Sequence, residues 1–495
     1  MTLREILRDI PGLLIEGEAG RDIQGLAYSS KSVEPGFLFA ALKGEKSDGL
    51  DFIAEAEARG AVVILSEWPR PEGCRLDWVR AEDAREALAL AAANFYGHPS
   101  LRLKTIGVTG TKGKTTITYI LEEIVKAAGG RPGVIGTIEY RLPGERLRAP
   151  RTTPEAPDLQ RLLALMVERS ATHGIMEVSS HALEQKRVWG VSFDIAVFTN
   201  LSGEHLDYHR SMDAYFEAKK KLFFLNHKRS ASVVNIDDPW GQKLIQELPL
   251  RTITFGTSPA AIVRAEKFRL LDNGLEVVIF YPGGRLAVAS RLVGKHNVYN
   301  ILAATGAALA LGIPAEAVAQ GIAGQRGVPG RFQTVPNPFG FKAVVDYAHT
   351  DDALLNLLET ARELKPRRII LVFGAGGNRD RAKRERMGEV AARLTDWTIL
   401  TSDNPRSEDP LAIIADIEKG FEKAGSSAYE VEPDRKEAIR KALSQALPGD
   451  HVLVAGKGHE DTQIFRDRTI AFSDVQTIAS LVEEMKQRRP WPSSA

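Results

Sequence analysis

Short apolar runs that alternate with longer amphipathic stretches predict strands and helices in the first hundred residues. Two apolar runs, FLFAAL (37–42) and AVVILSE (61–67), precede an alanine-rich stretch that stops at Gly97, His98 and Pro99. Runs of this length are typical of buried strands, and glycine followed by proline commonly ends a helix. We therefore predict a small α/β domain, closed by a helix, in residues 1–98.

The alternation continues through the middle of the chain. The strand-like run LKTIGVTG leads directly into the helical run TTITYILEEIVKAAG, and further strands are predicted at GVIGTIEY, GIMEVSS, FDIAVFTN and ASVVNID. Such alternation predicts a mainly parallel sheet that binds ligands at the carboxyl ends of its strands. Residues 268–292 instead predict hairpins, because Asn-Gly and Gly-Gly separate their strand-like runs. A helix follows over 295–312, and GVPGRF (327–332) has the composition of a hinge.

A third region repeats the pattern. The apolar runs FKAVVDYA, RRIILVFGA, WTILTSD and HVLVAGKG are each expected to be followed by a helix, the last being SDVQTIASLVEEMKQR. We predict an α/β protein of three domains: residues 1–98, a central P-loop ATPase-like domain over 99–331, and a Rossmann-like domain over 332–495.

Composition excludes several classes of protein. A net charge of +1 over 495 residues gives no support for a nucleic-acid-binding surface. The apolar run over 301–313 is shorter than the roughly 18 residues that span a bilayer. A single cysteine, Cys74, excludes an intramolecular disulfide, and the charged N-terminus lacks a signal-peptide core. We expect a cytoplasmic protein without nucleic-acid partners or membrane insertion.

The stretch GVTGTKGKTT (107–116) is typical of a phosphate-binding loop. The strict pattern G-x-x-x-x-G-K-[ST] would require glycine where Val108 stands, so we expect the strand to continue through Val108. The alternative, a solvated turn, does not account for the strand before it and the helix after it. Backbone N–H groups and a lysine at such a loop bind phosphate. The predicted nucleotide contacts are Gly110, Thr111, Lys112, Gly113, Lys114, Thr115 and Thr116.

Polar clusters follow the next strands. Glu177 lies inside an apolar run, and Asn200, Glu204 and His205 follow another, a combination that suits a hard cation such as Mg²⁺ at the phosphates. The competing interpretation is a capping or core histidine. Three consecutive lysines, 219–221, would point in directions about 100° apart on a helix, so at most one or two can face a site.

The ordered motifs of this chain resemble a known family. The motifs are GTKGKTT, TTPEAPDL, MEVSSHAL, TNLSGEHLDYH, AKKKLF, GKHNVYNILAA, PGRFQ, DYAHTDDAL, GAGGNRDR, TSDNPRSEDP and AGKGHED. In this order they resemble the Mur ligases, ATP-dependent enzymes that form amide bonds in peptidoglycan precursor synthesis.

The resemblance implies an activity and its substrates. ATP would phosphorylate the γ-carboxylate of D-glutamate in UDP-MurNAc-L-Ala-D-Glu, and an amine would displace phosphate from the acyl phosphate. The DNPR motif is similar to that of the members that add meso-diaminopimelate. The alternatives are a lysine-adding member, a folylpolyglutamate synthase or a nucleotide-binding protein without activity. We expect a monomer that uses Mg²⁺ and acts on these small molecules.

The resemblance also implies catalytic residues. Lys114, Glu177, His205 and Lys219 would be catalytic, with Thr115, Glu177 and His205 holding Mg²⁺ and Lys219 carbamylated. Lys220 and Lys221 would be solvated or packed. The remaining ATP contacts would be Asn297, Arg331 and Asp346, while His296, Asn300 and His349 stay open between nucleotide binding and local packing.

Further positions would bind the UDP-linked dipeptide. Ser30 lies in Ser29-Ser30-Lys31, where the family has Asp-Ser-Arg. For Thr152 and Thr153, capping of the next helix is an equal alternative. Lys46 and Ser47 are weaker candidates, for which an exposed turn is the alternative. The dipeptide-binding residues implied by the resemblance are Ser30, Thr152, Thr153, Ser179, Gln185 and Arg187.

The third domain would select the amino acid. Arginine can bind the second carboxylate of diaminopimelate, which lysine lacks, through two parallel hydrogen bonds. The alternative for Arg406 is a surface ion pair with Glu408 or Asp409. Asn378, Asp351 and Glu385 depart from the family pattern. The residues implied to bind diaminopimelate are Arg379, Asp403, Asn404, Pro405, Arg406, Gly456 and Glu460.

Overall fold

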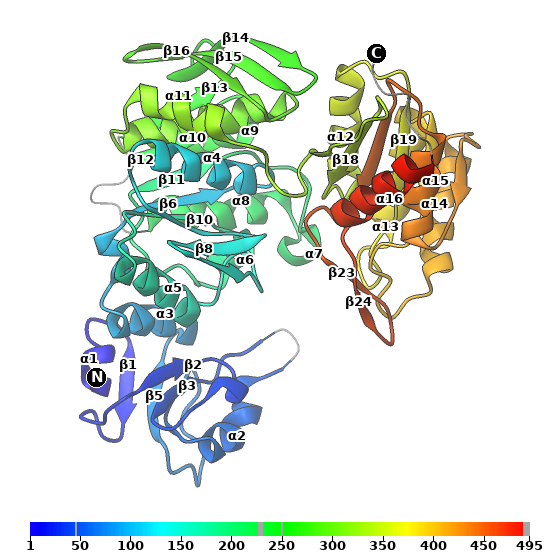
Figure 1. Ribbon diagram of the computed structural model, residues 1–495. Coiled ribbons are helices and arrows are strands. Elements are labelled where there is room, and N and C mark those ends of the chain that lie inside the picture. The colour runs from blue at the N-terminus through cyan, green and yellow to red at the C-terminus, as the bar shows by residue number, and fades with distance from the viewer. Residues whose placement is uncertain (45–46, 226–230, 249–250, 489–495) are drawn as a thin grey trace. The chain divides into compact units, whose positions relative to one another are not determined.

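The computed structural model describes residues 1–44, 47–225, 231–248 and 251–488 (Figure 1). None of the helices described there is long and apolar enough to cross a membrane. The chain forms two compact units. The first comprises Met1–Lys267, Val277–Val288 and Tyr299–Gly324, and the second comprises Phe268–Glu276, Ala289–Val298 and Gln325–Ala495.

The first unit begins with a five-stranded sheet in the order β1-β5-β4-β3-β2, in which only β1 runs antiparallel to its neighbour. Both predicted strands and the predicted closing helix are present as β3, β4 and α3. Asp83 begins α3 by accepting a hydrogen bond from the backbone of Glu86. The elements are α1 (Leu3–Ile6), β1 (Leu13–Glu16), β2 (Gly25–Ala27), η1 (Ser30–Ser32), β3 (Phe37–Ala40), η2 (Gly49–Phe52), α2 (Ile53–Ala58), β4 (Ala61–Ser66), β5 (Asp77–Ala81), α3 (Ala84–Phe95) and η3 (Pro99–Arg102).

A second sheet, of eleven strands in the described residues, has the order β16-β15-β14-β13-β12-β11-β6-β10-β7-β8-β9. Its pairs from β7 to β14 are parallel, which confirms the mainly parallel central sheet. Strands β14, β15 and β16 follow one another across two-residue turns, as expected for hairpins. The strands are β6 (Lys104–Thr109), β7 (Pro132–Ile135), β8 (Glu139–Leu142), β9 (Glu145–Arg148), β10 (His173–Glu177), β11 (Ile195–Phe198), β12 (Ala231–Asn235), β13 (Thr252–Gly256), β14 (Val263–Leu271), β15 (Gly274–Tyr281) and β16 (Gly284–Ser290).

One strand prediction in this sheet is wrong. GVIGTIEY was predicted to be a single strand, but β7 ends at Ile135 and β8 returns antiparallel to it. The chain turns at Gly136, where a side chain would come within 2.5 Å of a carboxylate oxygen of Glu177. The helices of this part of the chain are α4 (Lys114–Ala127), α5 (Ala156–Glu168), α6 (Ser180–Glu184), α7 (Leu206–His209), α8 (Met212–Lys220), η4 (Lys221–Phe224), α9 (Pro239–Ile245), α10 (His296–Ala310) and α11 (Ala315–Gly324).

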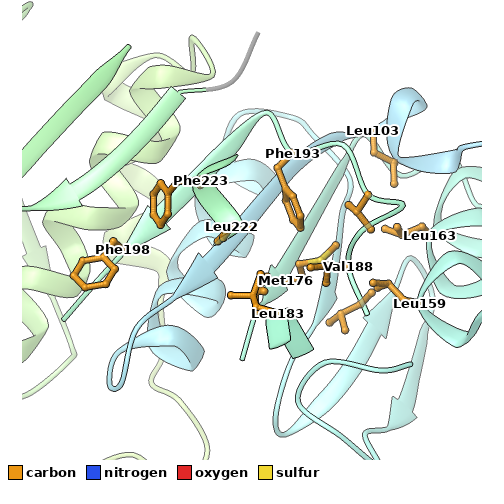
Figure 2. Packing of buried hydrophobic residues seen from close by; sticks show 14 of the residues in the cluster. Leu103, Leu159, Leu163, Met176, Leu183, Val188, Phe193, Phe198, Leu222 and Phe223 are labelled. Atoms are coloured by element: carbon orange, nitrogen blue, oxygen red, sulfur yellow. The ribbon is translucent and has the colours of Figure 1, made fainter. Parts of the chain in front are cut away.

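A continuous apolar cluster lies against one face of this sheet (Figure 2). Leu159 and Leu163 of α5, Met176 of β10 and Phe193 are all buried within it. Burying each large apolar side chain contributes about 1.5–3 kcal/mol relative to leaving it in water. This packing holds β6, β10 and β11 as neighbours, so that their carboxyl ends meet at one edge of the sheet.

The second unit contains a six-stranded sheet in the order β17-β18-β22-β19-β20-β21, with only β17 antiparallel. Apolar clusters cover both of its faces, as expected for a Rossmann-like sheet. A helix was expected directly after HVLVAGKG, but the hairpin β23–β24 comes first. The elements are β17 (Gln333–Val335), β18 (Lys342–Asp346), α12 (Asp351–Glu363), β19 (Ile369–Phe373), α13 (Ala382–Leu394), β20 (Trp397–Leu400), α14 (Pro410–Lys423), β21 (Tyr429–Val431), α15 (Arg435–Gln445), β22 (His451–Ala455), β23 (Thr462–Ile464), β24 (Thr469–Ala471) and α16 (Asp474–Arg488).

Candidate active site

The phosphate-binding loop lies between β6 and α4, and β6 continues through Val108 as expected. Gly110 and Gly113 have φ of +142° and +90°, a region in which side chains are strained. A side chain at Gly110 would come within 1.8 Å of Thr199 Oγ1, and one at Gly113 within 2.4 Å of Asn300 Oδ1. Asn300 therefore packs against the loop. These close approaches explain why the loop requires glycine at both positions.

Lys114, the first residue of α4, folds over this loop. Its Nζ donates hydrogen bonds to the carbonyl oxygens of Gly110 and Thr111, each at 2.8 Å. The ammonium is therefore held at the N-terminus of a helix, where the helix dipole and backbone N–H groups also favour an anion.

The end of β11 holds the other side of the loop. Asn200 Oδ1 accepts a hydrogen bond from the backbone N–H of Lys112 at 3.0 Å, and Thr199 Oγ1 donates to the Lys112 carbonyl at 2.7 Å. The backbone N–H of Thr111 donates to the Asn200 carbonyl. Sequence reasoning noted Asn200 at a strand end but missed Thr199, because nothing in the sequence indicates which strands are neighbours.

Glu177, the last residue of β10, is buried beside the start of α4. Its Oε2 accepts hydrogen bonds from Thr115 Oγ1 at 2.9 Å and from Thr137 Oγ1 at 3.0 Å, and its Oε1 accepts one from the Thr137 backbone at 2.8 Å. A hydroxyl and a carboxylate oxygen thus meet directly below the phosphate loop. These hard oxygen donors fit the ligand preference of Mg²⁺. Thr137 was missed because no motif marks it.

Lys219 is fully buried on α8 and reaches the same loop. Its Nζ donates to the Gly110 carbonyl at 2.8 Å and lies 4.4 Å from the centre of the Tyr215 ring. Burial lowers the pKa of Lys219 well below its usual value, and the positive charge of Lys114 lowers it further. Lys220 and Lys221 instead form ion pairs with Glu247 and Glu184, at 2.9 and 2.7 Å.

His205 lies in a group of aromatic rings after β11. Its ring is 5.0 Å from that of His181 and 6.1 Å from that of Tyr215. Desolvation lowers the pKa of His205 to about 4, and His181 contributes further. Across the described residues, no three His, Cys, Asp or Glu side chains are grouped to hold a metal ion. A metal ion at His205 stays a prediction.

The residues of the central region that were predicted to bind the dipeptide lie together next to Glu177. Thr153 Oγ1 donates to the Glu177 carbonyl at 2.8 Å and accepts a hydrogen bond from the Ser179 backbone at 3.1 Å. Arg187 donates to the Thr153 carbonyl at 3.0 Å and to Gln185 Oε1 at 2.6 Å. Burial lowers the pKa of Arg187, although its ion pair with Glu155 opposes the shift.

The alternative role of the threonines as helix caps is wrong. Helix α5 begins after Glu155, and no side chain caps its first turn. Thr152 Oγ1 lies 3.1 Å from Thr137 Oγ1, and Thr153 contacts Glu177 at the end of β10 and Ser179 after it. Both threonines therefore point to the end of the sheet where the phosphate loop lies.

Ser30 lies apart from this network, in the N-terminal sheet region. It is buried in η1, and its Oγ donates to Glu55 Oε2 at 2.8 Å. Lys31, next to it, is exposed. Lys46 lies outside the described residues, whereas Ser47 is exposed and its carbonyl accepts a hydrogen bond from the Gly44 backbone. A contact of Ser30 with the uridine end of a substrate stays a prediction.

In the second unit, Asp346 ends β18. Its carboxylate accepts hydrogen bonds from the backbone N–H groups of Phe332 and Ala348, at 2.6 and 2.9 Å. Burial raises the pKa of Asp346, and Arg331, whose guanidinium lies 4.9 Å from the Tyr347 ring, opposes the shift.

Two further ATP candidates in this unit make local contacts. Asn297 Nδ2 donates to the Val293 carbonyl at 2.7 Å and lies 3.1 Å from His296 Nε2. His349 Nδ1 is 2.8 Å from the Tyr347 carbonyl. The roles of these residues in ATP binding stay predictions.

Three loops at the carboxyl ends of β19, β20 and β22 meet around Arg406. Arg406 has a left-handed backbone with φ of +56°, and its Nη1 donates to the Gly377 carbonyl at 2.7 Å. Its backbone N–H donates to the Ile464 carbonyl at 3.0 Å. A side chain at Gly376 would come within 3.0 Å of Arg406 Nη1 and 3.9 Å of Arg379 Cγ, so both arginines flank that glycine.

The predicted alternative for Arg406 is wrong. Glu408 pairs with the buried Arg384 at 2.9 Å, and Asp409 caps α14 by accepting a hydrogen bond from the Leu411 backbone. Asn378, a departure from the family pattern, accepts hydrogen bonds from the backbone and the hydroxyl of Ser407. It thereby holds the 403–407 segment in place, which an aspartate could also do.

The carboxyl end of β22 completes this cluster. Asn404 Nδ2 donates to Glu460 Oε2 at 2.8 Å, and Gln463 Nε2 donates to the Asp403 carbonyl at 2.9 Å. A side chain at Gly456 would come within 3.6 Å of the Asp403 carboxylate. The structure thus brings together all seven residues predicted to bind diaminopimelate, since Pro405 lies between Asn404 and Arg406.

Comparison with known proteins relates this architecture to one family. Family models match residues 22–96 (Mur ligase family, catalytic domain), 108–308 (Mur ligase middle domain) and 330–458 (Mur ligase, glutamate ligase domain). The chain belongs to the Mur ligase family. This Mur ligase is 44% identical to the UDP-N-acetylmuramoyl-L-alanyl-D-glutamate--2,6-diaminopimelate ligase of Geobacter metallireducens, with 99% of each chain covered.

Other relatives agree with this assignment. The enzyme of the same name from Solibacter usitatus is 47% identical, with 96% of this chain and 97% of the relative covered. A solved structure of a ligase of that name superposes with a TM-score of 0.70 at 33% identity, covering 98% and 99% of the two chains. A folylpolyglutamate synthase from Mycobacterium tuberculosis shares only the fold, with a TM-score of 0.63 at 15% identity over 75% of this chain and 92% of that chain.

Proposed function

We propose that this Mur ligase is an ATP-dependent enzyme that joins meso-diaminopimelate to the γ-carboxylate of D-glutamate in UDP-MurNAc-L-Ala-D-Glu. The relatives that match nearly its whole length are named for a ligase of 2,6-diaminopimelate. The observation that carries the choice of amino acid is the left-handed Arg406 beside Arg379. Two guanidinium groups suit an amino acid that has a second carboxylate.

The first chemical step is transfer of the γ-phosphoryl group of ATP to the substrate carboxylate. A bond forms between phosphorus and a carboxylate oxygen as the bond to the leaving oxygen of ADP breaks. Lys114 and the N-terminus of α4 neutralise charge on the phosphates, which is the main requirement of this chemistry. Thr115 and Glu177 would hold Mg²⁺, which supplies further positive charge at the phosphate oxygens.

The second step is attack of the amino acid's amine on the acyl phosphate. The amine forms the amide bond and loses a proton, and inorganic phosphate leaves. Thr153, Gln185 and Arg187 orient the dipeptide carboxylate, because their network fixes their side chains beside Glu177. Holding both reactants in place lowers the entropic part of the barrier.

Lys219 is proposed to act as a carbamate. Its lowered pKa favours the neutral amine, which is the form that attacks carbon dioxide. One C–N bond forms as one C=O π bond of carbon dioxide opens, and one proton is released, so that a neutral amine at the phosphate loop becomes an anion. This change places a negative charge near the ammonium of Lys114 and provides an oxygen donor near the phosphates.

The test measures phosphate release and amide formation from ATP and UDP-MurNAc-L-Ala-D-Glu with meso-diaminopimelate, with L-lysine or with no amino acid. We expect diaminopimelate to be used far more efficiently than L-lysine. Product with lysine but not with diaminopimelate would identify a lysine-adding ligase. Phosphate release that depends on neither amino acid would favour a nucleotide-binding protein. The monomeric state and the cytoplasmic location stay predictions.

A further inference from the structure

Lys457 is a fully buried lysine at the carboxyl end of β22, between Gly456 and Gly458. Its Nζ lies 3.1 Å from Asn404 Oδ1, 3.3 Å from Glu460 Oε2 and 3.7 Å from Asp403 Oδ1. A buried cation is unfavourable unless it is paired and hydrogen-bonded. These contacts satisfy Lys457, and all three of its partners were predicted to bind the amino acid directly.

The first consequence concerns the orientation of the Asn404 side-chain amide. Asn404 Oδ1 accepts hydrogen bonds from Lys457 Nζ and from the backbone N–H of Ile464, at 3.1 and 3.0 Å. A flipped amide would place its NH₂ group against these two donors. Lys457 therefore keeps Nδ2 directed at Glu460, to which it donates at 2.8 Å.

The second consequence concerns Glu460. Its Oε2 receives hydrogen bonds from both Asn404 and Lys457, whereas its Oε1 receives none from the described part of the chain. The Glu460 side chain remains 32% exposed, although Lys457 is completely covered. One carboxylate oxygen is thus fixed by the protein and the other faces outward, where it can accept hydrogen bonds from an ammonium group.

We propose that Lys457 is a positioning residue for amino-acid selection. It holds Asn404 and Glu460 in the orientation that receives the second amino-acid head of diaminopimelate, without contacting the substrate. It also separates the negative charges of Asp403 and Glu460, which without it would repel each other and turn Glu460 away. The inference rests on the proposed function, because it assigns the cluster to that substrate.

A purely structural lysine would stabilise these loops without affecting selectivity, so the test must separate the two roles. The variants are Lys457→Met, Glu460→Gln and the double variant, with the exposed Lys436→Met on α15 of the same unit as the control. Steady-state rates are measured against diaminopimelate, L-lysine and ATP. The wild-type rate with diaminopimelate comes first, since its absence would mean that the proposed function, not the role of Lys457, has failed.

We expect Lys457→Met to raise the KM for diaminopimelate about 10- to 100-fold, as for loss of hydrogen bonds to a charged group. The KM for ATP and the rate with L-lysine should stay within about twofold of wild type, and Lys436→Met should change nothing. In the double variant the effect of Lys457→Met should largely vanish, because Lys457 acts through Glu460.

Two results would overturn the proposal. One is a KM for diaminopimelate that stays within about twofold of wild type in Lys457→Met. The other is an increase in the KM for diaminopimelate that either multiplies fully with that of Glu460→Gln in the double variant, or is accompanied by an equal increase in the KM for ATP. If Lys457→Met does not fold, Lys457→Gln replaces it in the single and double variants. Glutamine keeps a hydrogen-bond donor but carries no charge, and the same two results would overturn the proposal.

Discussion

Among the residues that the structure describes, two lysines are completely buried, and their surroundings are opposite. Lys219 contacts a carbonyl oxygen and an aromatic ring, and the positive charge of Lys114 acts on it more strongly than the negative charge of Glu204. Lys457 lies among Asp403, Asn404 and Glu460. The first environment disfavours an ammonium, whereas the second provides hydrogen-bond acceptors and negative charge. We therefore expect the same residue type to act as a reactive amine in one unit and to hold neighbouring side chains in place in the other.

The comparison also separates two ways of building a site. The phosphate loop is a contiguous segment whose backbone carries most of the function, and neighbouring strands only hold it in place. The cluster around Arg406 instead joins side chains from three loops, so that its geometry depends on several hydrogen bonds between these loops. We expect a substitution to reduce catalysis in the first site and selectivity in the second.

The largest effect should come from Lys219→Met, which keeps the bulk of the side chain but removes its nitrogen. We expect kcat to fall about 10²- to 10³-fold, as for loss of a charged group that stabilises the transition state. A short carboxylate added to the assay should restore part of the activity if Lys219 works as a carbamate. The control is Lys220→Met, whose side chain pairs with Glu217 and Glu247. Equal losses of kcat in both variants would show that the buried Lys219 has no special role in catalysis, and the proposed difference between Lys219 and Lys457 would be wrong.

The next prediction concerns how much a buried cation with a charged partner contributes to the stability of the protein. Arg435 forms two hydrogen bonds of 2.8 Å with Asp474, and both side chains are completely buried. We expect Asp474→Ala to lower the free energy of unfolding by about 3–5 kcal/mol, because Arg435 would keep its charge without a partner. Urea denaturation measures this, with the exposed Asp467→Ala as control. A loss below about 1 kcal/mol would contradict the expectation.

A smaller effect should follow from Arg406→Lys. We expect kcat/KM for diaminopimelate to fall about 10- to 100-fold, while the rate with L-lysine changes little, because lysine lacks the second carboxylate. The exposed Arg466→Lys in the neighbouring hairpin is the control. Equal losses with both amino acids would mean that Arg406 supports the loop rather than the selection of substrate.

The smallest effect concerns a buried histidine, His451 on β22. Burial lowers the pKa of His451 to about 4, and the positive charge of Lys342 adds to the shift. The unfolded chain, with a histidine pKa near 6.5, therefore binds more protons between these values, so stability falls as the pH drops below about 6.5. At pH 5.5 the part of this loss that His451 contributes should be about 1.4 kcal/mol relative to pH 8.

The variant His451→Gln checks this dependence. Its loss of stability between pH 8 and pH 5.5 should be smaller than that of wild type by about the same 1.4 kcal/mol. Chemical denaturation at the two pH values measures the difference, and identical pH dependences in the two proteins would contradict the assignment to His451.

Much of the fold and of the contiguous motifs could be predicted from the sequence. The phosphate loop was predictable because its function lies in one segment between a strand and a helix, and Val108 continues the strand as expected. Thr199 and Thr137 could not be predicted, because their importance depends on which strands are neighbours.

The amino-acid site shows the same limit. Arg406 and Glu460 were predictable from their motifs, but Lys457, Gln463 and Ile464 were not. Their effect arises only because β22 lies between β18 and β19 in the sheet, so that its end reaches the loop after β20. Strand order is a property of the packed sheet, whereas hydrophobic periodicity reports only the local element.

The buried ion pair between Arg435 and Asp474 has a consequence for how the chain folds while the ribosome makes it. Arg435 also donates to the Ala455 carbonyl at 3.0 Å, directly before Gly456 and Lys457. A ribosome completes the phosphate loop hundreds of residues before it reaches Asp474. A nascent chain can therefore form its phosphate loop early, whereas the cluster proposed to select the amino acid acquires its last support only when α16 emerges.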